Sequence, residues 1–316
     1  GTQMIWTNFL GGSNPSAGTE TAQSMICDLQ NNVYIYGTTS STDFPVSATA
    51  YQSTHNGGVA GLQIANNGVS FLSGGTDIYV SKLSSNGQNL LGSTFFGGSG
   101  NDGVNYNISG GNYQFASNYD SLSTNYGDQF RGEIMLDNLG NCIVGSCTRS
   151  SNFPTMNAVQ AANSGQLDGV IFRLSNNLST LQFSTYIGGS NNDAVYSVKV
   201  DSSYNIVFAG CTTSLNLPGT TGKYLPTYQG GKADGFVGKL SSNGSVLQGV
   251  TYIGTANYDQ VFFVEIDRTN KIFITGQSRG GGFPVNNASY VIPNSNNFIA
   301  KLDLTWNRKI HCLWAL

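Results

Sequence analysis

The segment from Asp193 to Gly254 contains four short runs rich in β-branched and aromatic residues: DAVYSVKVD (193–201), NIVFAGCTT (205–213), GFVGKLS (235–241) and VLQGVTYIG (246–254). Each run is apolar throughout or alternates with polar residues, which is the pattern of β-strands. The turn sequences DSSYN and SSNGS join the first run to the second and the third to the fourth. The segment is therefore predicted to form four strands linked as antiparallel hairpins.

The same unit occurs four times along the chain. An aspartate opens the first hairpin turn of each copy, and a proline follows it 17 residues later. The aspartates are Asp28, Asp137, Asp201 and Asp267, and the prolines are Pro45, Pro154, Pro218 and Pro284. A second block, TDIYVSKL, LDGVIFRL, ADGFVGKL and NNFIAKL, ends at Leu83, Leu174, Leu240 and Leu302. A regular period of this kind is the signature of a repeat architecture.

Two insertions, near 57–75 and near 103–129, lengthen the first interval between aspartates. Within a single domain of residues 1–316, the repeats then lie at approximately 14–98, 99–189, 190–254 and 255–316. A four-stranded sheet cannot bury both faces alone, and radial packing of such sheets around an axis solves that problem. The sequence therefore predicts an all-β fold, a β-propeller built of four-stranded antiparallel blades. About four blades lie in this chain, as a four-bladed propeller or as part of a larger one.

The order DGFVGKLSSNGSVLQGVTYIG, STYIGGSNND, VDSSYNIVFAGCTTS and TDFPVSATAYQSTHNGG resembles the seven-bladed β-propeller repeat family called SBBP. This resemblance implies a propeller fold and a place among secreted and surface proteins of bacteria, often of Bacteroidetes, with no shared catalytic set. Two segments depart from the pattern. The tail RKIHCLWAL has Leu313 where the register has threonine, and IWTNFLGGS at 5–13 matches a fourth strand without its preceding three. That segment either completes the last sheet or belongs to a longer propeller.

The composition argues against several classes of function. Lys and Arg total 14, Asp and Glu total 17, and the net charge is −3, so no basic surface for nucleic acid is expected. No run approaches the roughly 18 to 20 apolar residues that cross a bilayer, so no membrane span is predicted. The cysteines are odd in number and resemble no zinc pattern, and no metal site is predicted. Four of them lie in apolar runs and are expected to be buried: Cys27, Cys142, Cys147 and Cys211.

Two sets of residues are candidates for a binding site. Recurring acids follow the fourth strand of each unit: Glu20, Asp102, Asp193 and Asp259. They either cap turns by accepting backbone N–H groups, which we favour, or form a ring that binds calcium; no other cofactor is expected. The second insertion carries Tyr106, Tyr113, Phe115, Tyr119 and Tyr126. These aromatic rings either bind a sugar or a protein partner or pack on the neighbouring blade.

No sequence arrangement for nucleophilic catalysis is present, since neither histidine lies in a motif with serine. The chain is therefore expected not to be an enzyme. We expect an extracellular or cell-surface scaffold or adhesion module that binds protein or glycan through blade-connecting loops. One alternative is a carbohydrate-active enzyme with carboxylates at the propeller mouth. Another is a structural subunit that self-assembles through open blade edges.

Overall fold

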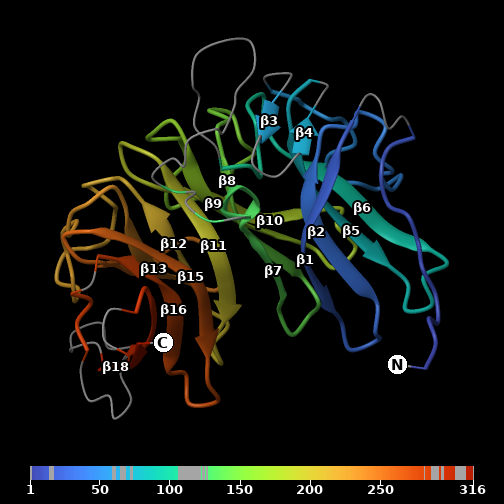
Figure 1. The fold of residues 1–316 in the computed structure, drawn as a ribbon. Helices are drawn as coiled ribbons and strands as arrows, with labels where there is room; N and C mark the ends of the chain where they lie inside the picture. Colours follow the sequence, from blue (N-terminus) through green and yellow to red (C-terminus); the bar gives the residue numbers. More distant parts are fainter. Residues whose placement is uncertain are drawn as a thin grey trace. The chain divides into compact units, whose positions relative to one another are not determined.

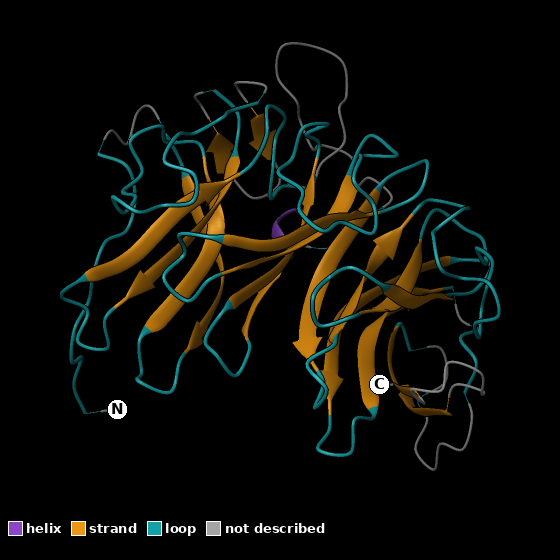
Figure 2. Ribbon diagram, turned by 180° about the vertical axis from the view of Figure 1, so that it is seen from behind, coloured by secondary structure: helices purple, strands orange, loops and turns teal. Residues whose placement is uncertain are grey.

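The computed structural model describes residues 2–13, 18–58, 62–64, 69–71, 74–105, 122, 125, 127–280, 282–285, 292, 295–302 and 311–315. These residues form eighteen β-strands and one 3-10 turn, η2 (Asp128–Phe130). The strands are drawn as arrows in Figure 1 and in orange in Figure 2. No α-helix is assigned in these residues. Among them, no helix has the length and apolar character needed to cross a membrane.

Each repeat forms one antiparallel four-stranded sheet, whose strands we call a, b, c and d in chain order. The first sheet contains β1 (Glu20–Cys27), β2 (Val33–Thr39), β5 (Asp77–Leu83) and β6 (Leu90–Phe96). The second contains β7 (Glu133–Leu136), β8 (Cys142–Thr148), β9 (Asp168–Leu174) and β10 (Leu181–Ile187). The third contains β11 (Asp193–Val200), β12 (Ile206–Thr212), β13 (Asp234–Leu240) and β14 (Leu247–Ile253). The fourth contains β15 (Tyr258–Ile266), β16 (Ile272–Arg279), β17 (Asn297–Leu302) and β18 (His311–Ala315).

In every sheet, neighbouring strands in the chain are also neighbours in space. Four-stranded antiparallel meanders of this kind are the blades of β-propellers, and the predicted fold class is confirmed. The chain divides into two compact units. The first comprises Gly1–Val144, Thr148–Pro154 and Phe172–Gln182. The second comprises Gly145–Cys147, Thr155–Ile171 and Phe183–Leu316.

Aromatic and branched side chains build a core within each unit. In the first unit, the ring of Phe96 stacks on that of Phe172 with centroids 4.0 Å apart, and Phe153 meets Phe96 edge to face. In the second unit, Val207 and Val261 belong to one buried apolar cluster contributed by the third and fourth sheets. Burial of apolar surface at roughly 25 cal/mol per Å² makes these cores the main source of stability.

The anchor aspartates close the turns between strands a and b. In the third sheet, Asp201 Oδ1 accepts hydrogen bonds from the backbone N–H of Ser203 at 2.8 Å and of Asn205 at 2.9 Å. Each of these turns has a left-handed residue three positions after its aspartate: Asn31 (φ 62°), Gly140 (φ 75°), Tyr204 (φ 62°) and Asn270 (φ 61°). An Asx turn followed by a left-handed residue reverses the chain tightly and fixes the register of the hairpin.

Strands were predicted in two segments outside the regular repeats, and the described residues contain only one of them. The insertion near 57–75 contains the predicted hairpin, because β3 (Leu62–Ile64) pairs with β4 (Val69–Phe71) in antiparallel register. The strand predicted at 5–13 is not formed, since residues 2–13 contain no strand. A ladder partner is what turns an extended segment into a strand, and none is assigned to these residues.

Candidate functional site

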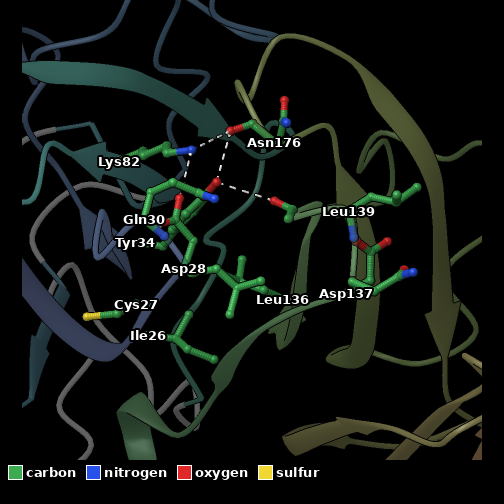
Figure 3. A pocket seen from close by; sticks show the side chains of 13 residues that line it. Ile26, Cys27, Asp28, Gln30, Tyr34, Lys82, Leu136, Asp137, Leu139 and Asn176 are labelled. Carbon is green, nitrogen blue, oxygen red and sulfur yellow. Dashed lines mark hydrogen bonds and ion pairs between the residues drawn. The ribbon is translucent and has the colours of Figure 1, made fainter.

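A cavity of about 530 Å³ opens in the first unit where three turns meet (Figure 3). The turns are those between β1 and β2, between β7 and β8, and between β9 and β10. Its polar lining consists of Asp28, Gln30, Tyr34, Lys82, Asp137, Asn138 and Asn176. Its apolar lining includes Ile26, Leu29, Leu136 and Leu139. We take this cavity as the candidate functional site because it combines aliphatic surface with convergent polar groups.

Asp28 and Lys82 form an ion pair in the wall of the cavity. Lys82 Nζ lies 3.2 Å from Asp28 Oδ2, and both side chains are largely buried. Asp28 Oδ1 also accepts hydrogen bonds from the backbone N–H of Gln30 at 2.9 Å and of Asn32 at 2.8 Å. Strand pairing sets this geometry, since Tyr34 of β2 stands opposite Lys82 of β5. The carboxylate is thus held by its own turn and by the adjacent strand.

Tyr34 links this ion pair to the other two turns. Lys82 Nζ lies 4.6 Å from the centroid of the Tyr34 ring, a cation–π contact. The Tyr34 hydroxyl lies 3.1 Å from the carbonyl oxygen of Asn176 and 3.3 Å from that of Gly140. Lys82 Nζ also donates to the Asn176 carbonyl at 3.5 Å. The polar floor of the cavity is therefore tied to all three turns.

The protonation states in this cluster follow from its contacts. Burial raises the pKa of Asp28, but hydrogen bonds from Asn32 and the charge of Lys82 outweigh burial and leave the pKa below its ordinary value. Burial lowers the pKa of Lys82, while Tyr34 and Asp28 outweigh that effect and raise it. Burial raises the pKa of Tyr34. At neutral pH the cluster thus holds a carboxylate, an ammonium and a neutral phenol, all engaged with one another.

The groups that face solvent at the rim are amides and leucines. The side chains of Gln30, Asn138 and Asn176 are exposed. Leu29 and Leu139 are 93% and 70% exposed, although they are large and apolar. A primary amide offers two donors and one acceptor oxygen, so three amides around aliphatic surface can hydrogen-bond a ligand rich in hydroxyl groups.

The Asp28–Lys82 pair has a counterpart in every repeat: Asp137 with Arg173, Asp201 with Lys239 and Asp267 with Lys301. The sequence analysis identified the aspartates but missed the cations. The signal was present, because a Lys or Arg stands directly before the leucine that ends each strand c. The recurring pair therefore belongs to the architecture of the repeat, and in the first unit the aspartates of two such pairs, Asp28 and Asp137, line the cavity.

The acids predicted to follow the fourth strand are placed in hydrogen-bonded turns. Asp102 accepts from the backbone N–H of Gly98 at 2.8 Å and from the hydroxyls of Thr148 and Ser150. Asp193 has the same contacts with Gly189, Thr212 and Ser214. Asp259 accepts from Thr255, and Glu20 accepts from Gly12 and Thr39. The structure therefore places each acid in its own hydrogen-bonded turn.

A second aspartate lies beside three of these acids: Asp77 beside Asp102, Asp168 beside Asp193 and Asp234 beside Asp259. A Cβ built on Gly97 would lie 2.6 Å from Asp77 Oδ1 and 2.6 Å from Asp102 Oδ2, so the two carboxyls flank that glycine. Burial raises the pKa of Asp77 to about 7. Burial and then the charge of Asp77 raise the pKa of Asp102 well above its ordinary value. Two adjacent buried carboxyls cannot both ionise at little cost, so protons are retained there.

The remaining predicted sites have the following outcomes. The residues described by the structure contain no group of three or more His, Cys, Asp or Glu side chains placed to hold a metal ion. Calcium binding stays an untested expectation. The five aromatic residues Tyr106, Tyr113, Phe115, Tyr119 and Tyr126 lie outside the described residues. Cys142, Cys147 and Cys211 are buried as expected, but that expectation is wrong for Cys27, which is exposed at the end of β1 beside the cavity.

Comparisons with known proteins give no match to a family model and no match to a curated protein. Among solved structures, the chain is similar to an ulvan lyase of polysaccharide lyase family PL25, with 10% identity, 96% of this chain and 59% of that chain covered, and a TM-score of 0.41. It is also similar to a mutant NanB sialidase from Streptococcus pneumoniae, with 9% identity, coverage of 95% and 48%, and a TM-score of 0.41. The chain spans 59% of the first of these proteins and 48% of the second.

Both of these proteins are enzymes by name. This finding contradicts the prediction that the chain is not an enzyme, and that prediction is not retained. The absence of a nucleophilic motif was its basis, and carbohydrate chemistry by carboxylates requires no such motif.

Proposed function

We propose that the chain binds carbohydrate, and that the cavity of the first unit is the binding site. The observation that carries the proposal is the combination of exposed amides with exposed leucines around one cavity. Gln30, Asn138 and Asn176 supply donors and acceptors for hydroxyl groups, and Leu29 and Leu139 supply surface for the C–H faces of a sugar ring. The buried pair of Asp28 and Lys82 holds this rim in place.

The charge of the lining favours a neutral sugar. Asp28 and Asp137 each contribute a carboxylate, while Lys82 contributes one cation, and its charge is matched by Asp28 at 3.2 Å. An anionic glycan would meet no unmatched cation among the lining residues, because Lys82 is paired with Asp28 and Asp137 is already paired with Arg173. The ligand class is therefore a neutral oligosaccharide.

Titration calorimetry with a panel of neutral and sulfated oligosaccharides tests this proposal. Gln30→Ala and Asn138→Ala should each weaken binding of the neutral sugar by about three- to tenfold, the worth of one hydrogen bond. Gln88→Ala is the matched control, since Gln88 lies in an exposed turn of the same unit outside this cavity. Equal effects of Gln30→Ala and Gln88→Ala, or no binding by the unaltered chain, would reject the proposal.

A further inference from the structure

The three aspartate pairs occupy equivalent places in successive repeats. One member of each pair is the first residue of a strand c, and we call it the strand c acid: Asp77, Asp168 and Asp234. The other member lies in the turn after strand d, and we call it the turn acid: Asp102, Asp193 and Asp259. All six side chains are 0% exposed. The first pair lies in the first unit and the other two lie in the second, so the arrangement is found in both.

Hydrogen-bond donors surround the turn acids. The hydroxyl of Ser150 lies 2.9 Å and 3.0 Å from the two carboxyl oxygens of Asp102, and the backbone N–H of Gly98 donates to Oδ2 at 2.8 Å. Thr148 Oγ1 accepts from the backbone N–H of Ser150 at 2.8 Å, so its own hydrogen is directed to Asp102 Oδ1. The corresponding donors of Asp193 are Gly189, Thr212 and Ser214. A carboxyl that only accepts hydrogen bonds is stabilised in its ionised form.

The strand c acids have donors on one oxygen only. Asp77 Oδ2 accepts from Gln52 Nε2 at 3.1 Å and from the backbone N–H of Asn56 at 2.8 Å. Asp77 Oδ1 is buried without a hydrogen-bond partner among the described residues, although the Gly57 N–H lowers the pKa of this carboxyl. Asp234 Oδ1 is buried in the same condition. An acceptor left in this state costs about 1–3 kcal/mol, so a further group is expected at Oδ1.

The Oδ1 atom of the strand c acid and the Oδ2 atom of the turn acid border the same small space. In the first unit, both lie 2.6 Å from the Cβ position of Gly97. In the second unit, Asp168 Oδ1 and Asp193 Oδ2 both lie 2.8 Å from the Cβ position of Gly188. Asp168 Oδ1 also accepts from the Gly165 N–H at 3.1 Å, which leaves it able to carry a proton. Glycine keeps the two carboxyls adjacent at both places.

The neighbouring titratable groups offer these pairs no buried cation. Around the first pair they are Glu20 on β1, His55 in the loop after β2 and Arg149 after β8. Burial lowers the pKa of His55, so this imidazole is neutral at neutral pH. Around the other two pairs they are Cys211, Tyr228, Tyr252 and the exposed Lys232. The charges that act on Asp102 and Asp234 are those of their own partners, Asp77 and Asp259.

Going beyond the proposed function, we propose that each pair binds one proton, which is carried on Oδ1 of the strand c acid and donated to Oδ2 of the turn acid. The strand c acids are then neutral, and the turn acids are carboxylates. Burial raises the pKa of both members of a pair, so the donors decide which member is ionised. Each proton forms a hydrogen bond between successive sheets. Its loss at alkaline pH leaves two adjacent buried charges and weakens both units.

Carbon-13 NMR of the unaltered chain, labelled at the aspartate carboxyl carbons, tests the proposal directly. The spectrum is recorded at pH 5, where ordinary aspartates are ionised. This pH lies below the raised pKa values of Asp168, about 6, Asp77, about 7, and Asp234, about 8. We expect three carboxyl resonances of the neutral form. Asp77→Asn, Asp168→Asn and Asp234→Asn should each remove one of them.

The proposal is overturned if all carboxyl carbons are ionised at pH 5, or if the neutral resonances belong to the turn acids. Addition of millimolar calcium at pH 7 is a further arm of the experiment. If calcium shifts the three resonances to the ionised form, the pairs hold a cation and the proposal is wrong.

Two amide substitutions in the first pair test where the proton lies. Asp77→Asn places an N–H group where the acid proton is proposed, so the melting temperature at pH 8 should rise by a few degrees. Asp102→Asn turns an amide N–H toward the donors of Gly98, Thr148 or Ser150, so it should lower the melting temperature at pH 5 and pH 8. Equal stabilisation by both substitutions would overturn the assignment. If Asp102→Asn does not fold, the NMR spectrum of the unaltered chain still decides.

Discussion

Strand β5 carries an acidic residue at its first position and a basic one near its last. The carboxyls at its two ends have pKa values shifted in opposite directions. At one end, Asp77 lies beside a second buried aspartate, Asp102, and its pKa is raised to about 7. At the other end, Lys82 lies 3.2 Å from Asp28, whose pKa is lowered. Both carboxyls are shielded from water by the same repeat. Burial raises the pKa of Asp77, whereas at Asp28 the hydrogen bonds of Asn32 and the charge of Lys82 outweigh burial, and this difference decides which carboxyl keeps its proton.

Because of this contrast, the contributions of the two ends to stability depend on pH in opposite directions. Asp28 is stabilised in its ionised form, so its contribution is present above its unfolded pKa and is lost as the pH falls through its lowered folded pKa. Asp77 is stabilised in its protonated form. Its contribution is present below the ordinary value of 3.8 and is lost as the pH rises toward about 7. Maximal stability should therefore lie in the mildly acidic range.

The largest effect is expected from Lys82→Met, which leaves the buried carboxylate of Asp28 without its cation. At pH 7 the free energy of unfolding should fall by about 2–4 kcal/mol, since removing one partner of a buried pair leaves an uncompensated charge. Urea denaturation at pH 7 and pH 3 measures this loss, which should shrink at the lower pH as Asp28 becomes protonated.

Lys301→Met is the matched control for that prediction. The pair of Lys301 with Asp267 is longer, at 3.8 Å, and its side chains are 36% and 34% exposed. Its removal should cost less than about 1 kcal/mol, as for other solvent-exposed pairs. Equal losses in Lys82→Met and Lys301→Met would show that burial does not distinguish the two repeats.

Asp77→Asn changes the other end of β5, and at alkaline pH it should raise the free energy of unfolding, whereas Lys82→Met lowers it. The amide keeps the size of the side chain and removes the charge that Asp102 opposes. We expect the melting temperature at pH 8 to rise by a few degrees, corresponding to roughly 1–2 kcal/mol. At pH 5, where Asp77 is already protonated, the gain should vanish. Thermal unfolding at both pH values measures it, and a gain of equal size at pH 5 would contradict the raised pKa.

The smallest effect is expected from Tyr34→Phe. The ring stays beside Lys82, while the hydroxyl that lies near the Gly140 and Asn176 carbonyls is removed. The free energy of unfolding should fall by about 0.5–1.5 kcal/mol, the net worth of a hydrogen bond. If urea denaturation shows no change, the hydroxyl does not hold the three turns together, and the cavity must depend on other contacts.

Much of the fold could be predicted because the repeat places the same residue types at the same intervals. Asp201, its hairpin turn and the strand ending at Leu240 each recur in register, and each copy forms one sheet. The segment at 5–13 has the same strand pattern, but residues 2–13 contain no strand. A strand also needs a partner, and a pattern within one segment carries no information about that partner.

The candidate site was less predictable because it depends on contacts between residues far apart in the chain. Asp28 and Lys82 are brought together only by the pairing of β2 with β5, across the first insertion. The cavity further requires Asn176, from a turn of the next repeat. The sequence pointed to the tyrosines near 103–129 because they are aromatic and not repetitive. The amides of Gln30 and Asn138 carry no such signal, since Asn and Gln are common throughout this chain.

The exposed sulfur of Cys27 provides a chemical handle on the proposed binding site. Cys142, Cys147 and Cys211 are buried, and burial raises the pKa of the Cys142 thiol, which keeps it unreactive. A maleimide dye should therefore react first with Cys27 among these four thiols. Because Cys27 lines the cavity, the dye would lie at the rim of the cavity. A change in its emission on adding a sugar would report occupancy without the introduction of a new cysteine.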